Sequence, residues 1–448
     1  MKRNLTFKES IFVASMLFGM FFGAGNLIFP VSMGQLAGSG VWKATAGFLI
    51  TGVGLPLLGV AALGISRQDG LLELSGRVGR PYGVFFTCAL YLTIGPFFAI
   101  PRCATVSFTV GVEKMFPEEN ARLVLAAFSL LFFAFVLFFS LRPGRILTWV
   151  GKILNPLFLL FLGILMIRAL LSPMGQISAQ AAMGEYETGA FFEGLLEGYN
   201  TMDALAGLAF GIIVVHVIRG LGVEEPGAVA KNTIRSGVFS SILMAAIYLL
   251  VAVVGAQSRG VMAPAANGGE ALAVIAEYYF GKAGAGILAA TVTLACLKTA
   301  VGLITSCGET FEKMFAGGPS YSFWTVAFCV LSFLIANLGL DAIIAYSIPV
   351  LMFLYPLAVT LILLTLFGRF FGEDQGVYRW VTGLTMVAAA MDFLNALPKS
   401  AVQLLHLEGL AAWGRHFLPF AGLGFGWLCP ALLGLVIGCG VRALRKKA

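Results

Sequence analysis

The chain has 448 residues, of which 59% are hydrophobic and 11% are charged, with a mean hydropathy of +0.92 and a formal net charge of +7. Soluble domains carry about 25% charged residues, so this composition excludes a soluble protein and predicts an integral membrane protein. The positive charge then reports orientation in a lipid bilayer and not an affinity for nucleic acid. The seven cysteines are odd in number and lie in apolar stretches, which favours packing residues over disulfides or a metal site.

Twelve apolar segments follow one another, each long enough for a transmembrane helix, which takes about 20 residues. They cover residues 9–36, 42–66, 82–112, 121–141, 146–171, 189–217, 233–256, 283–311, 321–338, 341–367, 378–397 and 418–441. No short alternating segments typical of a membrane barrel are present. We therefore predict an all-α polytopic membrane protein of one domain, because no segment between the spans is long enough for a soluble domain.

An even number of spans places both chain ends on the same side. Nineteen of the 29 Lys and Arg residues then fall on the side of the ends, eight fall on the other side, and Arg102 and Lys298 fall inside spans. Because loops rich in Lys and Arg stay in the cytoplasm, we expect both termini to be cytoplasmic.

The first span is interrupted in its middle, from Phe22 to Pro30, by two glycines, an asparagine and a proline. Such residues are poor helix formers, and unpaired backbone survives in a bilayer only where it lines a cavity or meets a ligand. The ends of two half-helices present free N–H and C=O groups, which suit a carboxylate and a cation. The alternative is a kink that only helps helices to pack.

A second interruption lies in the sixth span, from Gly198 to Gly207. Broken helices at positions one and six, running in opposite directions, are typical of an inverted repeat of five plus five helices. We predict a first repeat over 1–175, a second over 185–370, and two accessory helices with a basic cytoplasmic tail over 375–448.

Arg102 is a charge inside the third span, which is costly in a membrane and indicates function. We expect it to form a gate or a site-ordering ion pair with an acidic residue of the sixth span, namely Asp203, Glu197 or Glu193. The alternative is an arginine whose long side chain reaches the lipid surface.

Several segments together resemble the bacterial branched-chain amino acid carrier family. They are Gly23 to Pro30, Tyr91 to Pro96, Ala99 to Arg102, Ala104 to Phe108, Gly198 to Asp203 and Ser332 to Leu338. The resemblance implies a sodium-coupled symporter, not an enzyme, with twelve helices and a LeuT-type core. It would import leucine, isoleucine and valine across the bacterial cytoplasmic membrane by alternating access, with no cofactor beyond the coupling ion and no obligatory protein partner.

The same resemblance implies where the amino acid binds. Its carboxylate would meet the backbone N–H groups of the first break, and its ammonium would meet carbonyl groups just before that break. The residues concerned are Phe21, Phe22, Gly23, Ala24, Gly25 and Asn26, with Thr201 and Asp203 added from the second break. Ile94, Phe97 and Phe98 are candidates for the dry wall around a branched side chain, although aromatic residues on an apolar helix also serve plain packing.

In sodium-coupled relatives of the LeuT type, the eighth span and the first span share a sodium ion. The match implies ligands at Gly19, Phe22, Ala295 and Thr299, but the position next to Thr299 is Lys298. An ammonium offers no oxygen to sodium and would take the place of the cation, and burial favours its neutral form. Lys298 would then make the carrier proton-coupled or uncoupled. Alternatively, its side chain bends away or pairs with Asp203 while sodium binds as usual.

Three other functions are weaker alternatives. A carrier of another small solute on the same fold remains open. A membrane enzyme would need several His, Cys, Asp or Glu at one depth, and a channel would need a continuous polar face on several helices.

Overall fold

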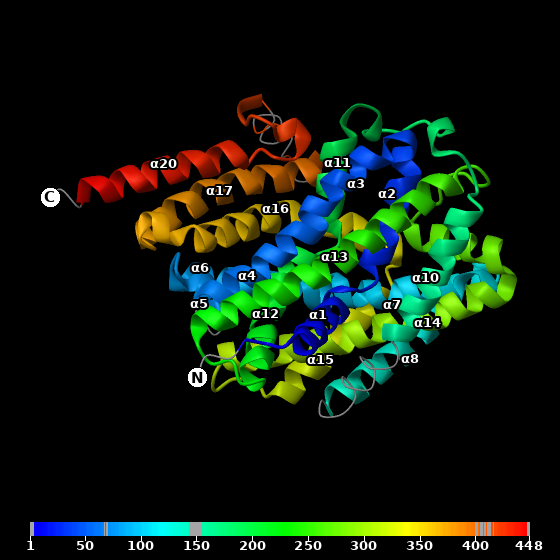
Figure 1. The fold of residues 1–448 in the computed structure, drawn as a ribbon, viewed down its shortest axis with the longest axis horizontal. Helices are drawn as coiled ribbons and strands as arrows, with labels where there is room; N and C mark the ends of the chain where they lie inside the picture. Colours follow the sequence, from blue (N-terminus) through cyan, green and yellow to red (C-terminus); the bar gives the residue numbers. More distant parts are fainter. Residues whose placement is uncertain are drawn as a thin grey trace.

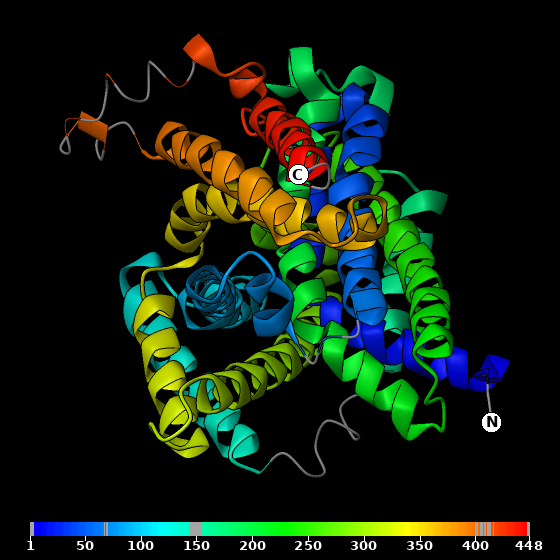
Figure 2. The same ribbon diagram turned by 90° about the vertical axis from the view of Figure 1, so that its left-hand side faces the viewer.

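A computed structural model describes residues 4–66, 68, 70–142, 155–398 and 416–445, with residues 402, 403, 406, 409 and 414 between the last two ranges. Within these residues the regular secondary structure is helical throughout (Figures 1 and 2). The predicted residues 146–154 of the fifth span and the tail residues Lys446 and Lys447 lie outside the described residues.

The longer helices follow the predicted spans closely. In the first part of the chain they are α1 (Phe7–Phe21), α2 (Gly25–Ala37), α3 (Val41–Leu49), α4 (Leu55–Ser66), α5 (Leu71–Gly76), α6 (Arg80–Leu92), α7 (Ala99–Gly111), α8 (Ala121–Ser140) and α10 (Asn155–Leu171). In the second part they are α11 (Tyr186–Asn200), α12 (Asp203–Gly220), α13 (Pro226–Ser258), α14 (Gly268–Met314), α15 (Tyr321–Ala336), α16 (Leu340–Leu366), α17 (Gln375–Ala396) and α20 (Leu428–Arg445).

Seven of the described helical segments are long and apolar enough to cross a membrane, and the number is eight if the bent pair Asp203–Gly211 and Ile213–Gly220 forms one span. Leu159–Leu171 and Tyr321–Ala336 are apolar but shorter. The count of twelve spans therefore stays a prediction, although a helix lies in each of the twelve predicted ranges.

Both predicted helix breaks are present. The first span ends as α1 at Phe21 and resumes as α2 at Gly25, and Phe22 between them is extended. The sixth span ends as α11 at Asn200 and resumes as α12 at Asp203, across a left-handed Met202 with φ 63° and ψ 11°. Each break thus leaves one helix C-terminus and one helix N-terminus in the interior.

The third span contains an irregular turn that was not predicted. A π-helical turn at Thr93–Phe97 separates α6 from α7, and Gly95 inside it has φ −92° and ψ −125°. Pro96 lacks an N–H group and disfavours the helical conformation of the preceding residue. The turn also packs tightly, because a Cβ atom at Gly95 would lie 2.7 Å from Sγ of Cys307 on α14.

Other boundaries also differ from the predicted ranges. A further helical segment, residues 268–280, precedes the eighth span inside α14, and Gly281, with φ 62° and ψ −163°, separates it from the predicted start at 283. The seventh span begins earlier, at Pro226 instead of 233. The last helix begins later, at Leu428 instead of 418. Residues 418–427 contain Gly422, Gly424 and Gly426, and glycine is a poor helix former.

The two broken spans pack against the seventh and the second spans in a matching way. The first break is flanked by α2 on α13, the second by α11 on α3 and α12 on α4, and α7 packs along α14. Small residues allow close approach, because Gly194 on α11 faces the backbone of Ala44 on α3. Figures 1 and 2 show α17 and α20, in orange and red, together along α16 at one edge of the bundle.

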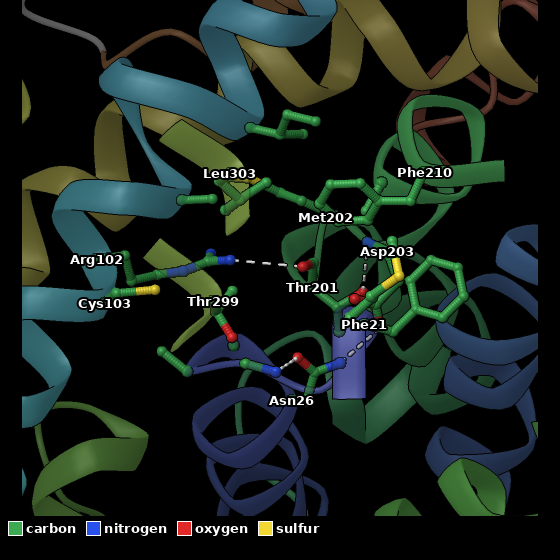
Figure 3. Close-up of a pocket in the computed structure, with 17 residues that line it drawn as sticks. Phe21, Asn26, Arg102, Cys103, Thr201, Met202, Asp203, Phe210, Thr299 and Leu303 are labelled. Carbon is green, nitrogen blue, oxygen red and sulfur yellow. Dashed lines mark hydrogen bonds between the residues drawn. The ribbon is translucent and has the colours of Figure 1, made fainter. Parts of the chain in front are cut away.

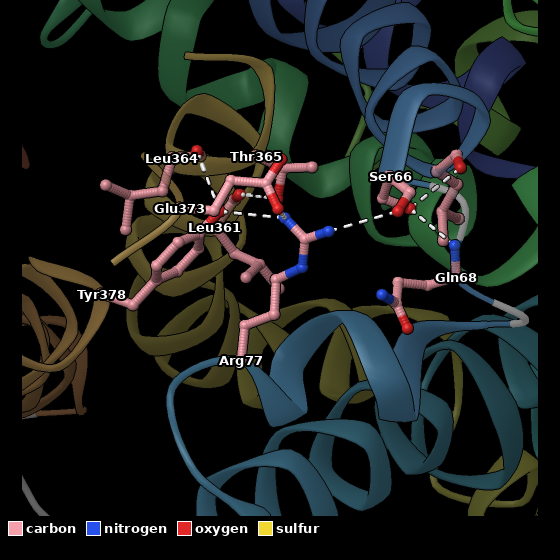
Figure 4. Close-up of polar contacts among 9 residues, drawn as sticks. Ser66, Gln68, Arg77, Leu361, Leu364, Thr365, Glu373 and Tyr378 are labelled. Carbon is pink, nitrogen blue, oxygen red and sulfur yellow. Dashed lines mark hydrogen bonds and ion pairs between the residues drawn. The ribbon is translucent and has the colours of Figure 1, made fainter. Parts of the chain in front are cut away.

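A polar contact ties this edge to the first part of the chain (Figure 4). Arg77, just after α5, forms an ion pair of 3.5 Å with Glu373, and it donates hydrogen bonds to the Tyr378 hydroxyl at 3.3 Å and to the carbonyl of Ser66 at 3.2 Å. The end of α4, the α5–α6 turn and the start of α17 are therefore held together by one arginine.

Candidate functional site

A cavity lies where the two helix breaks meet α7 and α14 (Figure 3). It contains about 390 Å³ of empty space, its open side included. Its lining residues are Met20, Phe21, Gly23, Ala24, Gly25 and Asn26 from the first break, Ile94, Ala99, Arg102 and Cys103 from the third span, Thr201, Met202, Asp203, Ala206 and Phe210 from the second break, and Thr299 and Leu303 from α14. Most of these side chains are apolar.

Four helix ends point at this cavity. The C-termini of α1 and α11 carry free carbonyl groups and partial negative charge, and the N-termini of α2 and α12 carry free N–H groups and partial positive charge. Two of these ends already face a charged side chain. Asp203 is the first residue of α12, and Arg102 lies at the C-terminus of α11.

A network of hydrogen bonds joins the two breaks. The Gly23 N–H donates to Oδ1 of Asn26 at 2.7 Å, and Nδ2 of Asn26 donates to Oδ2 of Asp203 at 2.6 Å. The hydroxyl of Tyr248 on α13 donates to the same oxygen at 2.8 Å, and it also contacts Nδ2 of Asn26. All three side chains are buried. Asn26 therefore orders the first break while it holds Asp203, the only acidic residue among the described residues that line the cavity.

Arg102 is bound by backbone and not by an acid. The residue is 3% exposed, its Nη1 donates to the carbonyl of Asn200 at 2.7 Å, and its Nη2 lies 3.5 Å from the carbonyl of Thr201. The guanidinium also lies over the ring of Phe29, 4.9 Å from its centre.

The predicted ion pair of Arg102 with Asp203, Glu197 or Glu193 is not formed in this conformation, since no carboxylate of the described residues lies within 4.0 Å of the guanidinium. The carbonyl groups at the end of α11 supply its acceptors instead. For another state of the protein the ion pair stays a prediction. The alternative of a lipid-facing arginine is wrong, because Arg102 is buried and lines the cavity.

The cavity brings together most of the predicted substrate residues. Phe21, Gly23, Ala24, Gly25, Asn26, Ile94, Thr201 and Asp203 line it, whereas Phe22, Phe97 and Phe98 do not. Phe97 is 37% exposed. That any of them binds a substrate stays a prediction.

Of the residues predicted to bind sodium, one lines the cavity and the others do not. Thr299 lines the cavity, donates to the carbonyl of Ala295 at 3.1 Å, and adjoins Gly23, where a Cβ atom would lie 3.2 Å from its methyl group. Gly19, Ala295 and Lys298 are not lining residues. Where the ammonium of Lys298 binds stays a prediction. Among the described residues no group of three or more His, Cys, Asp or Glu is arranged to hold a metal ion.

Several cavity residues were not predicted. Tyr248 on α13 was also not predicted; it does not line the cavity itself but contacts Asn26 and Asp203, which do. Met20, Met202, Phe210 and Leu303 complete an apolar wall, and Cys103 faces the first break. Nothing in their local sequence distinguishes these apolar residues from ordinary packing.

Comparisons with known proteins agree with this geometry. The profile of a family described as branched-chain amino acid transport protein matches residues 6–445. The chain is 54% identical to a branched-chain amino acid permease, BrnQ, of Lactobacillus delbrueckii subsp. lactis, over 96% of both chains. It is 39% identical to the branched-chain amino acid permease BraB of Bacillus subtilis, over 98% of this chain and 96% of the relative.

Two solved structures share the fold at low sequence identity. One is Mhp1, a transporter of the nucleobase-cation-symport-1 family in a closed conformation with bromovinylhydantoin bound, with a TM-score of 0.62, 14% identity, and coverage of 98% of this chain and 93% of that one. The other is MhsT in complex with L-phenylalanine, with a TM-score of 0.60, 15% identity and 99% coverage of both chains.

Proposed function

Because the chain belongs to the family of branched-chain amino acid transport proteins, we propose that it is a secondary transporter that imports leucine, isoleucine and valine by alternating access. The observation that carries this proposal is the cavity between two helix breaks, which combines polar helix ends with an apolar wall. A branched-chain amino acid has the same two parts, a charged backbone and an apolar side chain.

The carboxylate would bind at the N-terminus of α2. No side chain within the described residues caps this helix, so its first N–H groups suit an anion. The ammonium would bind near the carbonyl groups of Phe21 and Phe22 at the end of α1 and near Asp203. The branched side chain would then lie against Ile94, Phe210 and Leu303, which exclude water.

The packing supports five plus five inverted helices. If the first and sixth spans correspond, as do the second and seventh, then α2 on α13 corresponds to α11 and α12 on α3 and α4. The third and eighth spans also correspond, so exchanging the two repeats leaves the contact between α7 and α14 in place. We infer twelve spans with cytoplasmic termini in the bacterial cytoplasmic membrane, on the distribution of Lys and Arg.

The coupling ion has two candidates. Sodium is implied by the resemblance to sodium-coupled carriers, and Thr299 beside Gly23 supports a site between α14 and the first break. A proton, or no ion, is the alternative, with Lys298 in place of sodium.

Uptake of labelled leucine into proteoliposomes tests the proposal, with sodium and pH gradients imposed separately. We expect saturable leucine uptake that isoleucine and valine inhibit and that arginine and glutamate do not. Stimulation by an inward sodium gradient alone assigns sodium, and stimulation by a pH gradient alone assigns the proton. Saturable uptake of arginine or glutamate without a leucine response would overturn the proposal.

A further inference from the structure

Arg102 is buried without a full set of partners. Its Nε has no hydrogen-bond partner among the described residues, and the contact from Nη2 to the carbonyl of Thr201 is at the long limit for a hydrogen bond. A guanidinium presents its N–H groups as a fixed fork that matches the two oxygens of a carboxylate. The edge formed by Nε and Nη2 is thus the part of Arg102 that the protein leaves least occupied.

The edge of the guanidinium formed by Nε and Nη2 lies against the N-terminus of α2, which is also positive. A Cβ atom at Gly25, the first residue of α2, would lie 2.8 Å from Nη2 of Arg102 and 3.3 Å from its central carbon. The N-terminus of α2 carries partial positive charge and no side-chain cap among the described residues. Two positive groups therefore lie side by side in a buried place, and an anion that contacts both of them would stabilise this arrangement.

Asp203 does not supply that anion. Its Oδ2 accepts from Asn26 and Tyr248, and no ion pair within 4.0 Å joins it to Arg102 in the described part of the chain. Asp203 instead faces the N-terminus of its own helix, α12. The cavity thus holds one positive and one negative side chain that remain apart (Figure 3).

We propose that Arg102 binds the carboxylate of the transported amino acid, together with the N-terminus of α2, and so selects zwitterions over amines. This inference rests on the proposed function and adds a residue to it. The charges of Arg102 and Asp203 cancel, and a zwitterion keeps the cavity neutral. Leucinol, which has the ammonium and side chain of leucine but no carboxylate, would leave Arg102 without its anion and add an uncompensated positive charge.

The test is binding of radiolabelled leucine to the purified full-length protein, with leucinol and 4-methylpentanoate as competitors. We expect leucinol to compete at least about 30-fold more weakly than unlabelled leucine, the loss typical of an unpaired buried charge. The Arg102→Gln variant keeps N–H donors for the carbonyl groups of Asn200 and Thr201 but has no charge. It should lower leucine affinity by about 30-fold and bring the leucine-to-leucinol ratio close to one.

Two further variants separate charge from structure. Arg102→Lys keeps the charge without the fork and should retain a preference for leucine over leucinol. Arg168→Gln is the matched control, because Arg168 is an exposed arginine in the apolar helix α10, and it should leave leucine binding unchanged.

The outcomes distinguish the inference from the proposed function. Absence of leucine binding and uptake in the wild type would overturn the proposed function. Leucine binding with equal competition by leucinol would overturn only the inference, as would an unchanged leucine-to-leucinol ratio in Arg102→Gln. If Arg102→Gln does not fold, the Gly25→Ala variant is tested instead, because the methyl group of the new alanine would displace the guanidinium of Arg102. It should weaken leucine more than leucinol, and an equal loss for both would contradict the inference.

Discussion

Two arginines, Arg102 at the cavity and Arg77 at the edge of the bundle, show two ways of accommodating a positive charge. Arg77 is 16% exposed in its side chain and has a carboxylate partner, Glu373, together with a hydroxyl and a carbonyl acceptor. Arg102 is 3% exposed, and within the described part of the chain it contacts carbonyl acceptors and an aromatic ring but no carboxylate. The more deeply buried arginine therefore has the weaker set of partners.

This difference indicates different roles. Partially exposed ion pairs contribute little to stability, about 0–1 kcal/mol, because water already solvates both charges. A buried charge without a counterion is costly, and it is retained where a ligand or a function requires it. The charge of Arg77 is thus paired without a ligand, whereas the charge of Arg102 is paired only when an anion binds. The predictions below test this contrast, from the largest expected effect to the smallest.

Gly25→Val should abolish saturable leucine uptake. Its Cβ atom would lie 2.8 Å from Nη2 of Arg102 and 3.3 Å from Phe29, so overpacking and displacement of the guanidinium together lower leucine affinity by at least about 100-fold. Uptake into proteoliposomes at matched protein density measures the effect. Gly302→Val on α14 is the control, because a Cβ atom there meets no atom within 4 Å. Equal loss in both variants would show a general effect of valine in a helix.

Tyr248→Phe should lower leucine uptake by roughly 10-fold, because loss of a hydrogen bond to a charged group costs about 1–3 kcal/mol and loosens Asp203. Transport kinetics at several leucine concentrations measure it. Tyr82→Phe is the matched control, since the buried hydroxyl of Tyr82 has no hydrogen-bond partner in the described structure. Normal uptake by Tyr248→Phe would show that Asn26 alone positions Asp203.

How far these residues could be predicted depends on whether a local pattern marks them. The two breaks were predictable, because Gly, Asn and Pro stand out in apolar runs, and both breaks were expected to contribute to one binding site. The break at Gly95 carried the same signal in the following proline, and only its effect on the helix was missed.

The partners of Arg102 and Asp203 were not predictable in the same way. Tyr248 is one residue in the long apolar helix α13, and only the packing of α13 on α2 brings it to Asn26. The acceptors of Arg102 are backbone carbonyls, whose availability depends on the residue at which α11 ends. Helix ends are uncertain by one or two residues from sequence alone, so an acidic side chain was the natural expectation, and carbonyl groups take that place in this conformation.

Lys298 on α14 is a basic residue to compare with Arg77 and Arg102. It is next to Thr299 in the sequence but does not line the cavity. If its ammonium takes the place of sodium, wild-type uptake should persist without sodium and respond to a pH gradient. Lys298→Thr would add a hydroxyl oxygen and should then make uptake sodium-dependent, with a change of a few-fold in maximal rate. Strictly sodium-driven uptake in the wild type, together with normal behaviour of Lys298→Ala, would show that sodium binds without this side chain.

Arg77→Gln should have the smallest effect, because its ion pair with Glu373 is partly exposed and contributes about 0–1 kcal/mol. We expect leucine affinity and the leucine-to-leucinol ratio to stay within about threefold of the wild type, the limit set by that energy. Glu373→Gln should behave alike, and the double variant should add little to either single change, since both remove the same contact. Thermal unfolding in detergent, measured at low and high salt, reports the contact itself, because salt screens an exposed pair and should reduce the difference between Arg77→Gln and the wild type. A loss of leucine selectivity in Arg77→Gln as large as that in Arg102→Gln would contradict the contrast between the two arginines, because a charge at the edge of the bundle would then determine what the cavity binds.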